Sequence, residues 1–353
     1  MHHALLREIK VKVAIASTFV PFAANPYRGL VVALEEALRL EGHQTEVVLL
    51  PQVDVPDRLI SQILAFRLVG LESVDRLICL RPQAHMIPHR NKVVWLLDGL
   101  LAGVEQWKFG GYPIKHTRDR GQLDAVRTSD KRCFDECKTV FVGSPSLKKS
   151  MLSVHAIGSV LLRPPLPVPT KLGNNAQSST ILCLSSYDEN SRLHIIIQAL
   201  ACSSSTLNLK ILGNRCHPSF QRLLSQLIID LGMEQRVSLD FGPTSEEVLT
   251  TALAECVAVI DLEASGTTAG DGMIRCTRAA RCMIVAGDGG ANLDDVIDGV
   301  TGVVIEPDVA SVAAMLHSLE AGAIDHAALG RNLHERAGKA AMSWPETLRQ
   351  LLG

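Results

Sequence analysis

The stretch CVAVIDLEASGTTAGDGMIRCTRAARCMIVAGDGGANLDDVIDGVTGVVIEP, residues 256–307, decides the fold. Its apolar run at 257–260 ends in a small, polar, glycine-rich loop at 264–272. A segment of helix length, 273–280, then leads to a second apolar run at 283–286. This order of strand, turn, helix and strand is typical of a parallel α/β unit.

The glycine-rich loop of this unit is a candidate anion site. A turn between a strand and a helix gathers free backbone N–H groups at the start of the helix, where a phosphate can bind. Gly266, Thr267, Thr268 and Gly270 supply the small and hydroxyl-bearing residues of this loop. The alternative is an ordinary turn without a ligand, because a glycine-rich loop alone is a weak signal.

Length and composition predict two α/β domains. The chain has 353 residues, which fits two domains of roughly 170 residues better than one. Apolar residues make up 47% and aromatic residues only 4% of the chain, which suits parallel strands covered by helices on both faces. We therefore expect two Rossmann-like domains with parallel sheets.

The charge balance does not favour a nucleic-acid partner. The chain has 35 basic and 37 acidic residues and a formal net charge of -2, so no long-range attraction to a polyanion is expected. No run reaches the ~18 apolar residues of a membrane-spanning helix, and residues 1–10 do not resemble a signal peptide. We expect a cytoplasmic protein whose contact with membranes is at most peripheral.

The nine cysteines favour reduced thiols. Their number is odd and several lie within apolar, strand-like runs, which suits a cytosolic protein. Cys133 and Cys137 could share one helix face, but no further Cys or His follows at the spacing of a metal site. The sequence therefore predicts no metal site.

The order of residues after the glycine-rich loop is more specific than the pattern of strands and helices. DGG at 288–290 is followed by Asp294, then by DGVTG at 298–302 and EP at 306–307. This order resembles the donor domain of retaining glycosyltransferases of family 4, which have the GT-B fold of two Rossmann-like domains with a cleft between them. The resemblance implies transfer of a sugar from a nucleotide sugar.

The resemblance covers nearly the whole chain. Residues 85–111 resemble a bacterial subgroup of the family that reads H-x-N-K-V-V-W-L, and the proline-rich run 161–169 resembles its crossing between domains. Residues 343–352 resemble the closing helix of the family. We predict an N-terminal, acceptor-side domain at 1–163, a proline-rich linker at 164–178, a nucleotide-sugar-side domain at 179–340 and a C-terminal helix at 341–353 that crosses back to the first domain.

The resemblance also assigns site residues, and the charged side chains of the family are replaced at these positions. The two glutamates of the family fall on Thr267 and Arg275, and its diphosphate-binding arginine and lysine fall on Ser186 and Ser191. Its strand-end histidine falls on Asp98, which could orient a hydroxyl or act as a base, or instead form an Asx turn. Asp98 and Thr267 therefore stand at the catalytic positions.

Two arginines could compensate for the lost charges. Arg192 lies one residue beyond the lysine position, and with Arg275 it could hold a phosphate through its guanidinium; the alternative for Arg192 is a solvated residue at a helix start. Asn25 and Pro26 replace two glycines of the acceptor-side loop, where the proline removes an N–H donor. The predicted donor-binding residues are Ser186, Ser191, Arg192, Gly266, Thr268, Gly270 and Arg275.

Two functions are consistent with these residues. The first is a glycosyltransferase of hexosyltransferase type, which uses a nucleotide sugar as substrate without a further cofactor and a saccharide or lipid-linked acceptor in surface or exopolysaccharide synthesis. The second is a catalytically inactive GT-B relative that acts as a binding or scaffolding subunit, for example of a partner glycosyltransferase. Each charge-assisted contact with the donor that this chain lacks costs about 1.5–3 kcal/mol of donor binding, which is the reason to consider the second function. A sugar-nucleotide epimerase would share the two-domain shape, but no residue points to it.

Overall fold

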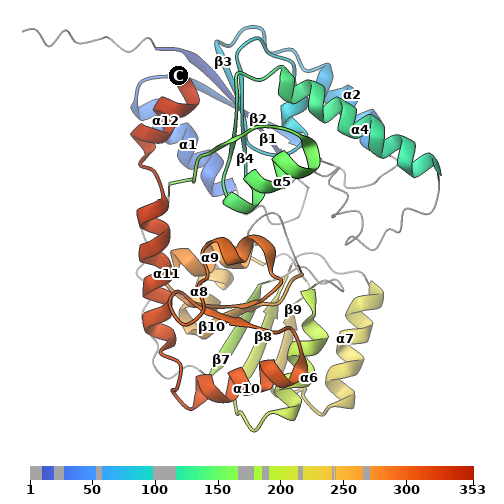
Figure 1. Ribbon diagram of the computed structural model, residues 1–353, viewed down its shortest axis with the longest axis vertical. Coiled ribbons are helices and arrows are strands. Elements are labelled where there is room, and N and C mark those ends of the chain that lie inside the picture. Colours follow the sequence, from blue (N-terminus) through green and yellow to red (C-terminus); the bar gives the residue numbers. More distant parts are fainter. Residues whose placement is uncertain are drawn as a thin grey trace, which may run out of the picture.

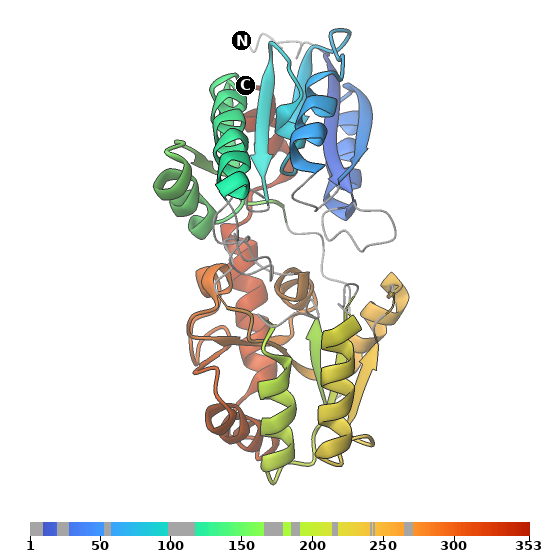
Figure 2. The same ribbon diagram turned by 90° about the vertical axis from the view of Figure 1, so that its right-hand side faces the viewer.

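The computed structural model describes residues 10–19, 28–52, 58–97, 117–165, 179–184, 191–213, 218–240, 242, 244–264 and 271–353. Within these residues the strands form two separate parallel sheets of six strands each, and helices cover both sheets (Figures 1 and 2). The predicted fold class, α/β with two Rossmann-like halves, is confirmed.

The first sheet has the strand order β2-β1-β3-β4-β5-β6, and all of its neighbouring strands are parallel. Its central strands are mostly buried because helices pack on both faces, whereas the two edge strands are partly exposed. The strands are β1 (Lys12–Phe19), β2 (Gln44–Pro51), β3 (Arg76–Cys79), β4 (Lys92–Leu96), β5 (Thr139–Val142) and β6 (Val160–Leu161), and the helices are α1 (Arg28–Leu40), α2 (Leu59–Arg67), η2 (Ala84–Met86), α4 (Thr117–Asp135) and α5 (Pro145–His155).

The second sheet has the strand order β12-β11-β10-β7-β8-β9 and is also parallel. Its strands are β7 (Thr180–Leu184), β8 (Asn208–Leu212), β9 (Val237–Asp240), β10 (Cys256–Asp261), β11 (Cys282–Ala286) and β12 (Val303–Ile305). The helices of this half are α6 (Leu193–Cys202), α7 (Pro218–Asp230), α8 (Glu246–Glu255), α9 (Asp271–Arg278), η4 (Gly290–Asp294), α10 (Val309–Glu320) and α11 (His326–Ala340).

Each sheet has a topological switch point, which is the place where the order of the strands reverses direction. In the second sheet the chain runs from β7 outward to β9 on one side, and then from β10 outward to β12 on the other. The crevice at the carboxyl ends of the two central strands, β7 and β10, is where ligands bind in open parallel sheets. The residues that follow these strands are therefore the first candidates for a functional site.

The central unit of the sequence folds as predicted, whereas α11 was not among the predicted helices. The strand, helix and strand expected between residues 257 and 286 are β10, α9 and β11. The helix α11 was missed, although Leu329, Leu333 and Ala337 lie four residues apart and are buried. At Gly330, in the same helix, a Cβ atom would collide with the backbone of Ala280. This close approach requires glycine at position 330. Because glycine has no apolar side chain, it interrupts the apolar pattern by which the helix could have been predicted.

The C-terminal helix α12 (Trp344–Leu352) leaves the second half and packs against α1 of the first half (Figure 1). Ser343 begins the helix with a capping box, because its hydroxyl accepts the N–H of Glu346 while the Glu346 carboxylate accepts the N–H of Ser343. Leu348 and Leu351 are buried in the apolar cluster that α1 and the first sheet form. The Arg76 guanidinium donates to the backbone carbonyls of the last two residues.

No helix in the described part of the chain is both long enough and apolar enough to span a membrane.

The docking of α12 can be tested with two Leu-to-Ala substitutions. Leu351 is fully buried, whereas Leu40, at the end of α1, is 82% exposed. We expect Leu351→Ala to lower the free energy of unfolding by about 2–5 kcal/mol, because it leaves a cavity in the core. We expect Leu40→Ala to change it by less than about 0.5 kcal/mol. Urea denaturation of both variants measures the difference, and equal losses would contradict the docking of α12.

Candidate functional site

A cavity of about 300 Å³ lies between the two halves. Leu30 of α1 and Leu97 after β4 line it from the first half, and Met273 and Ile274 of α9 line it from the second. Ile274 also packs against the apolar cluster of the first half. The two halves thus meet at α9, and the lining of the cavity here is mainly apolar.

Arg192 lies at the carboxyl edge of the second sheet and binds a carboxylate there. Its two terminal nitrogens donate to the two carboxylate oxygens of Asp288, with N–O distances of 2.7 and 2.6 Å. Nη1 also lies 3.3 Å from the carbonyl oxygen of Leu262. The Arg192 guanidinium holds the pKa of the Asp288 carboxyl below its ordinary value. Arg192 therefore joins the start of α6 to the residues that follow β10 and β11.

Asp261, the last residue of β10, is a buried carboxyl group at the same edge. Its Oδ1 accepts the backbone N–H of Glu263 at 3.0 Å, and its Oδ2 accepts the amide of Asn292 at 3.2 Å. Burial raises the pKa of Asp261 above its ordinary value, because the charged form loses hydration. The Asn292 Oδ1 atom is buried and has no hydrogen-bond partner among the described residues.

Two consecutive aspartates after Asn292 bind the first half of the molecule. Asp294 accepts the backbone N–H of Ser146 at 2.9 Å and its hydroxyl at 2.8 Å, at the start of α5. The two carboxylate oxygens of Asp295 lie 2.8 and 2.9 Å from Nη1 of Arg163. A carboxylate at a helix N-terminus is stabilised by the helix dipole. The η4 segment thus holds the two halves together through charged contacts.

Arg275 of α9 binds the carboxylate of Glu246 at the start of α8. The two N–O distances are 2.7 and 2.8 Å, which makes this pair bidentate as well. The hydrogen bond from Arg275 lowers the pKa of Glu246. Both arginines that were predicted to bind an anion therefore bind an internal carboxylate.

The structure describes three of the predicted site residues. Arg192 stands directly before α6 and Arg275 lies within α9, and these helices follow the central strands β7 and β10. Each arginine binds its own carboxylate. Ser191 is buried directly before Arg192. The remaining predicted positions lie outside the described residues: Asn25, Pro26, Asp98, Ser186, Gly266, Thr267, Thr268 and Gly270.

Sequence reasoning missed the acidic partners of these arginines. Asp288 and Asp294 belong to the residue pattern on which the family resemblance rests, but no contact was predicted for them. Asp295 and Glu246 were not singled out at all. A signal was present in part, because Asp288 follows an apolar strand and therefore had to lie at the carboxyl edge of the sheet.

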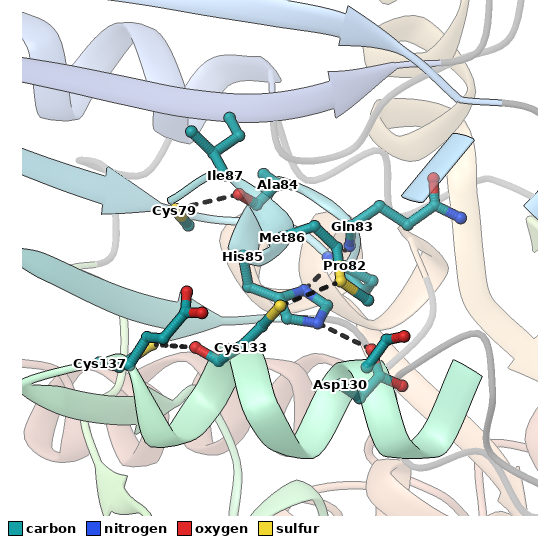
Figure 3. Close-up of polar contacts among 12 residues, drawn as sticks. Cys79, Pro82, Gln83, Ala84, His85, Met86, Ile87, Asp130, Cys133 and Cys137 are labelled. Atoms are coloured by element: carbon teal, nitrogen blue, oxygen red, sulfur yellow. Dashed lines mark hydrogen bonds and ion pairs between the residues drawn. The ribbon is translucent and has the colours of Figure 1, made fainter. Parts of the chain in front are cut away.

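A buried histidine organises the loop after β3 (Figure 3). Nδ1 of His85 accepts the backbone N–H of Gln83 at 3.1 Å, so Nε2 carries the proton and donates to Asp130 on α4 at 2.8 Å. The imidazole also stacks on Phe134, with ring centroids 4.5 Å apart. Gln83 has a φ of 73°, which is unusual for a residue with a side chain. The hydrogen bond to His85 stabilises this backbone conformation.

The most distinctive motif of the N-terminal half, N-K-V-V-W at 91–95, is structural. The buried ammonium group of Lys92 donates to the carbonyl oxygens of His85 and Ile87, at 2.8 and 3.1 Å, and lies 3.2 Å from Glu136. The Trp95 indole donates to a backbone carbonyl at 2.8 Å. These side chains bind the backbone of their own half, so the motif is explained by folding.

The cysteines of this region are inert thiols. Cys133 and Cys137 lie beside the histidine loop (Figure 3), and the Cys137 thiol donates to the carbonyl oxygen of Cys133. Burial raises the pKa of Cys133, and it raises that of Cys137 to about 12, so neither thiol forms a thiolate at neutral pH. Within the described ranges no three His, Cys, Asp or Glu side chains are placed to hold a metal ion.

Two parallel α/β halves with a crevice between them define the GT-B class of folds. A structure of sucrose-phosphate synthase from Thermosynechococcus elongatus matches this chain at 14% identity and a TM-score of 0.71, over 96% of this chain and 97% of that one. Anabaena HepE, solved with UDP and glucose, matches at 15% and 0.66, over 96% and 98%. Starch synthase IV of Arabidopsis thaliana, bound to ADP and acarbose, matches at 12% and 0.63, over 97% and 98%.

These similarities show that the chain has the GT-B fold, as the resemblance in its sequence implied. The sequence matches no protein-family model. It also matches no curated protein.

The structural role of Lys92 can be tested against an exposed lysine. We expect Lys92→Met to lower the free energy of unfolding on the order of 3 kcal/mol, because it leaves buried carbonyls and Glu136 without the ammonium donor. Lys131 is exposed and pairs with Asp135, so Lys131→Met should cost less than about 1 kcal/mol. Chemical denaturation measures both values, and a loss of similar size in both variants would contradict the role of Lys92.

The buried carboxyl of Asp261 predicts an unusual dependence of stability on pH. Its pKa is higher in the folded than in the unfolded protein. The contribution of this carboxyl to the free energy of unfolding is therefore fully present below the unfolded pKa of about 3.9. It is lost as the pH rises through the higher folded pKa. We expect Asp261→Asn to be more stable than wild type at pH 7, with the difference vanishing toward pH 3.5.

Asp308 provides a control of opposite sign. It caps α10 by accepting the N–H and the hydroxyl of Ser311, and the backbone hydrogen bond is the main cause that lowers its pKa. Asp308→Asn should therefore lose stability at pH 7 relative to wild type. Thermal unfolding between pH 3.5 and pH 8 measures both variants. An Asp261→Asn variant that is less stable than wild type at pH 7 would contradict the buried, high-pKa carboxyl.

Proposed function

We propose that this protein is a glycosyltransferase-like protein that binds a nucleotide sugar in the crevice between its two sheets. The observation that carries the proposal is the GT-B fold, which extends over 96–97% of the chain. HepE was solved with UDP and glucose and starch synthase IV with ADP, and both proteins have this fold. These ligands support a nucleotide-sugar donor for this chain.

The proposed donor site lies at the carboxyl edge of the second sheet. A transfer from a nucleotide sugar requires cationic or N–H donors for the diphosphate and polar groups that stabilise charge as the glycosidic bond breaks. Arg192 and Arg275 are the proposed diphosphate ligands, together with the loop that contains Gly266, Thr268 and Gly270. Ser186 and Ser191 stand at the positions of the family's basic residues.

The remaining residues are assigned their proposed roles by the family resemblance in the sequence. Asp98 and Thr267 are the proposed polar groups at the transferred sugar, where retention of configuration is the expected outcome, and Asn25 and Pro26 belong to the acceptor side. The proposed division of the chain is a domain at 1–163, a linker at 164–178, a domain at 179–340 and the crossing segment 341–353.

The proposed biological setting is surface or exopolysaccharide synthesis in the cytoplasm, with a saccharide or lipid-linked acceptor. Eight of the cysteines are described and all eight are free thiols, which supports a reducing compartment.

A second candidate function is supported by the ion pairs of the two arginines. Asp288 and Glu246 bind Arg192 and Arg275 through both carboxylate oxygens. A diphosphate that bound the two terminal nitrogens of either guanidinium would have to replace its carboxylate. On this basis the alternative is a GT-B protein without transferase activity that acts as a binding or scaffolding subunit, with a partner glycosyltransferase as its proposed target.

The two functions can be separated by the thermal stability of the protein in the presence of nucleotide sugars. A ligand that binds only the folded state adds about 2.7 kcal/mol at a concentration of 100 times its dissociation constant. We expect one member of a panel of UDP-, GDP-, ADP- and dTDP-sugars, with and without a divalent metal, to raise the unfolding temperature. No shift with any member at millimolar concentration would contradict the donor site and favour the scaffold.

The variants Arg275→Ala and Arg39→Ala refine this experiment. Arg39 is exposed on α1 and pairs with Glu35, so its removal is the matched control. We expect the shift caused by the active nucleotide sugar to be lost in Arg275→Ala and retained in Arg39→Ala. Equal shifts in both variants would remove Arg275 from the donor site.

A further inference from the structure

The ion pair between Arg192 and Asp288 has the geometry of an arginine bound to a phosphate. Both terminal nitrogens of the guanidinium are engaged, one with each carboxylate oxygen, at 2.7 and 2.6 Å. Parallel N–H···O bonds of this kind are the mode in which arginine binds carboxylate and phosphate alike. Asp288 therefore occupies the two terminal nitrogens through which Arg192 would bind an anionic ligand end-on.

The backbone of Arg192 has an uncommon conformation. The residue has a φ of 52° and a ψ of 29°, in the left-handed region, and stands directly before the ten-residue helix α6. This conformation is uncommon for residues other than glycine, asparagine and aspartate, and it clusters at ligand sites. The Arg192 side chain makes no capping bond to α6. Its guanidinium instead reaches across the carboxyl edge to Leu262 and Asp288.

The backbone of the segment that carries Asp288 is anchored on its C-terminal side. Gly289 donates its N–H to the carbonyl oxygen of Ala286 at 2.9 Å, and a Cβ atom at Gly289 would lie 2.9 Å from the same oxygen. Asn292 binds Asp261, and the next two aspartates bind the first half. A shift of the whole segment would break all of these contacts at once and is therefore unfavourable. Rotation of the Asp288 side chain breaks none of them, so Arg192 can be released by this rotation alone.

The Asp288 side chain is free to rotate into solvent. It is 51% exposed, whereas the Arg192 side chain is 19% exposed. Because the pair is bidentate, it is stronger than an ordinary surface ion pair, so an incoming polyanion displaces the carboxylate at a cost to its own affinity. Arg192 lowers the pKa of Asp288, which keeps the carboxylate charged and competing at neutral pH.

We propose that Asp288 is an internal counter-anion that competes with the phosphate groups of a nucleotide for Arg192. Binding of the diphosphate exchanges one anion for another at the guanidinium, and Asp288 turns outward. The inference rests on the proposed function for the class of ligand, a nucleoside diphosphate or its sugar conjugate. It adds that the affinity of the wild-type protein is limited by its own carboxylate.

The test is the affinity of UDP and of inorganic pyrophosphate for four proteins, measured by isothermal titration calorimetry. These are the wild type, Asp288→Asn, the double variant Arg192→Ala with Asp288→Asn, and Asp135→Asn. Asp135 pairs with Lys131 on the exposed face of α4, so its substitution changes the net charge equally without touching the crevice. Thermal unfolding of each variant confirms that it is folded.

We expect Asp288→Asn to bind UDP at least tenfold more tightly than the wild type, whereas Asp135→Asn matches the wild type and the double variant loses the gain. Equal affinity of UDP for the wild type and Asp288→Asn overturns the inference and leaves the proposed function standing. A double variant that keeps the gain also overturns it, because Arg192 is then not the competing site.

Pyrophosphate distinguishes failure of the inference from failure of the proposed function. Tighter binding of pyrophosphate to Asp288→Asn than to the wild type, without binding of UDP to either, supports the counter-anion and contradicts the nucleotide ligand. Absence of binding of both ligands to both proteins overturns the inference and the proposed donor site together.

Discussion

The crevice edge and the polar contacts between the two halves depend on the side chains of one short segment, residues 288–295 between β11 and β12. Each polar side chain of this segment binds a different part of the molecule. The partners are the residue before α6, the end of β10, the start of α5 and an arginine two residues beyond β6. Because these contacts are spread over both halves, the segment fixes the crevice edge and the arrangement of the halves together. The pairs are Asp288 with Arg192, Asn292 with Asp261, Asp294 with Ser146, and Asp295 with Arg163.

The same contacts determine how the fold relates to function. A GT-B fold provides a crevice at the carboxyl edges of two sheets, but a fold alone does not establish an activity. What the proposed donor site can bind depends on whether its proposed ligands, Arg192 and Arg275, are available. Arg192 and Arg275 are both held by carboxylates. Binding of a nucleotide sugar at the proposed donor site therefore depends on the free energy of exchanging these carboxylates for a phosphate.

Motifs of the sequence divide into those that build the fold and those that lie at the site. The N-K-V-V-W segment is the most distinctive stretch of the N-terminal half, yet Lys92 and Trp95 bind backbone carbonyls inside that half. The pattern that begins at Asp288 lies instead at the crevice edge and carries the contacts between the halves. Similarity to a family motif thus does not by itself identify a binding residue, because buried donors and acceptors must also be paired.

The sequence by itself determined the class of the fold and the positions of the central strand, helix and strand, because apolar periodicity and turn residues are local properties. It also identified Arg192 and Arg275 as the cationic candidates at the crevice. Only the tertiary structure decided that both are paired, since Arg192 and Asp288 are 96 positions apart and Arg275 and Glu246 are 29 apart. It likewise placed α11, whose glycine packs against the backbone of a neighbouring turn. Such pairings depend on how the elements assemble in three dimensions, and no local pattern records them.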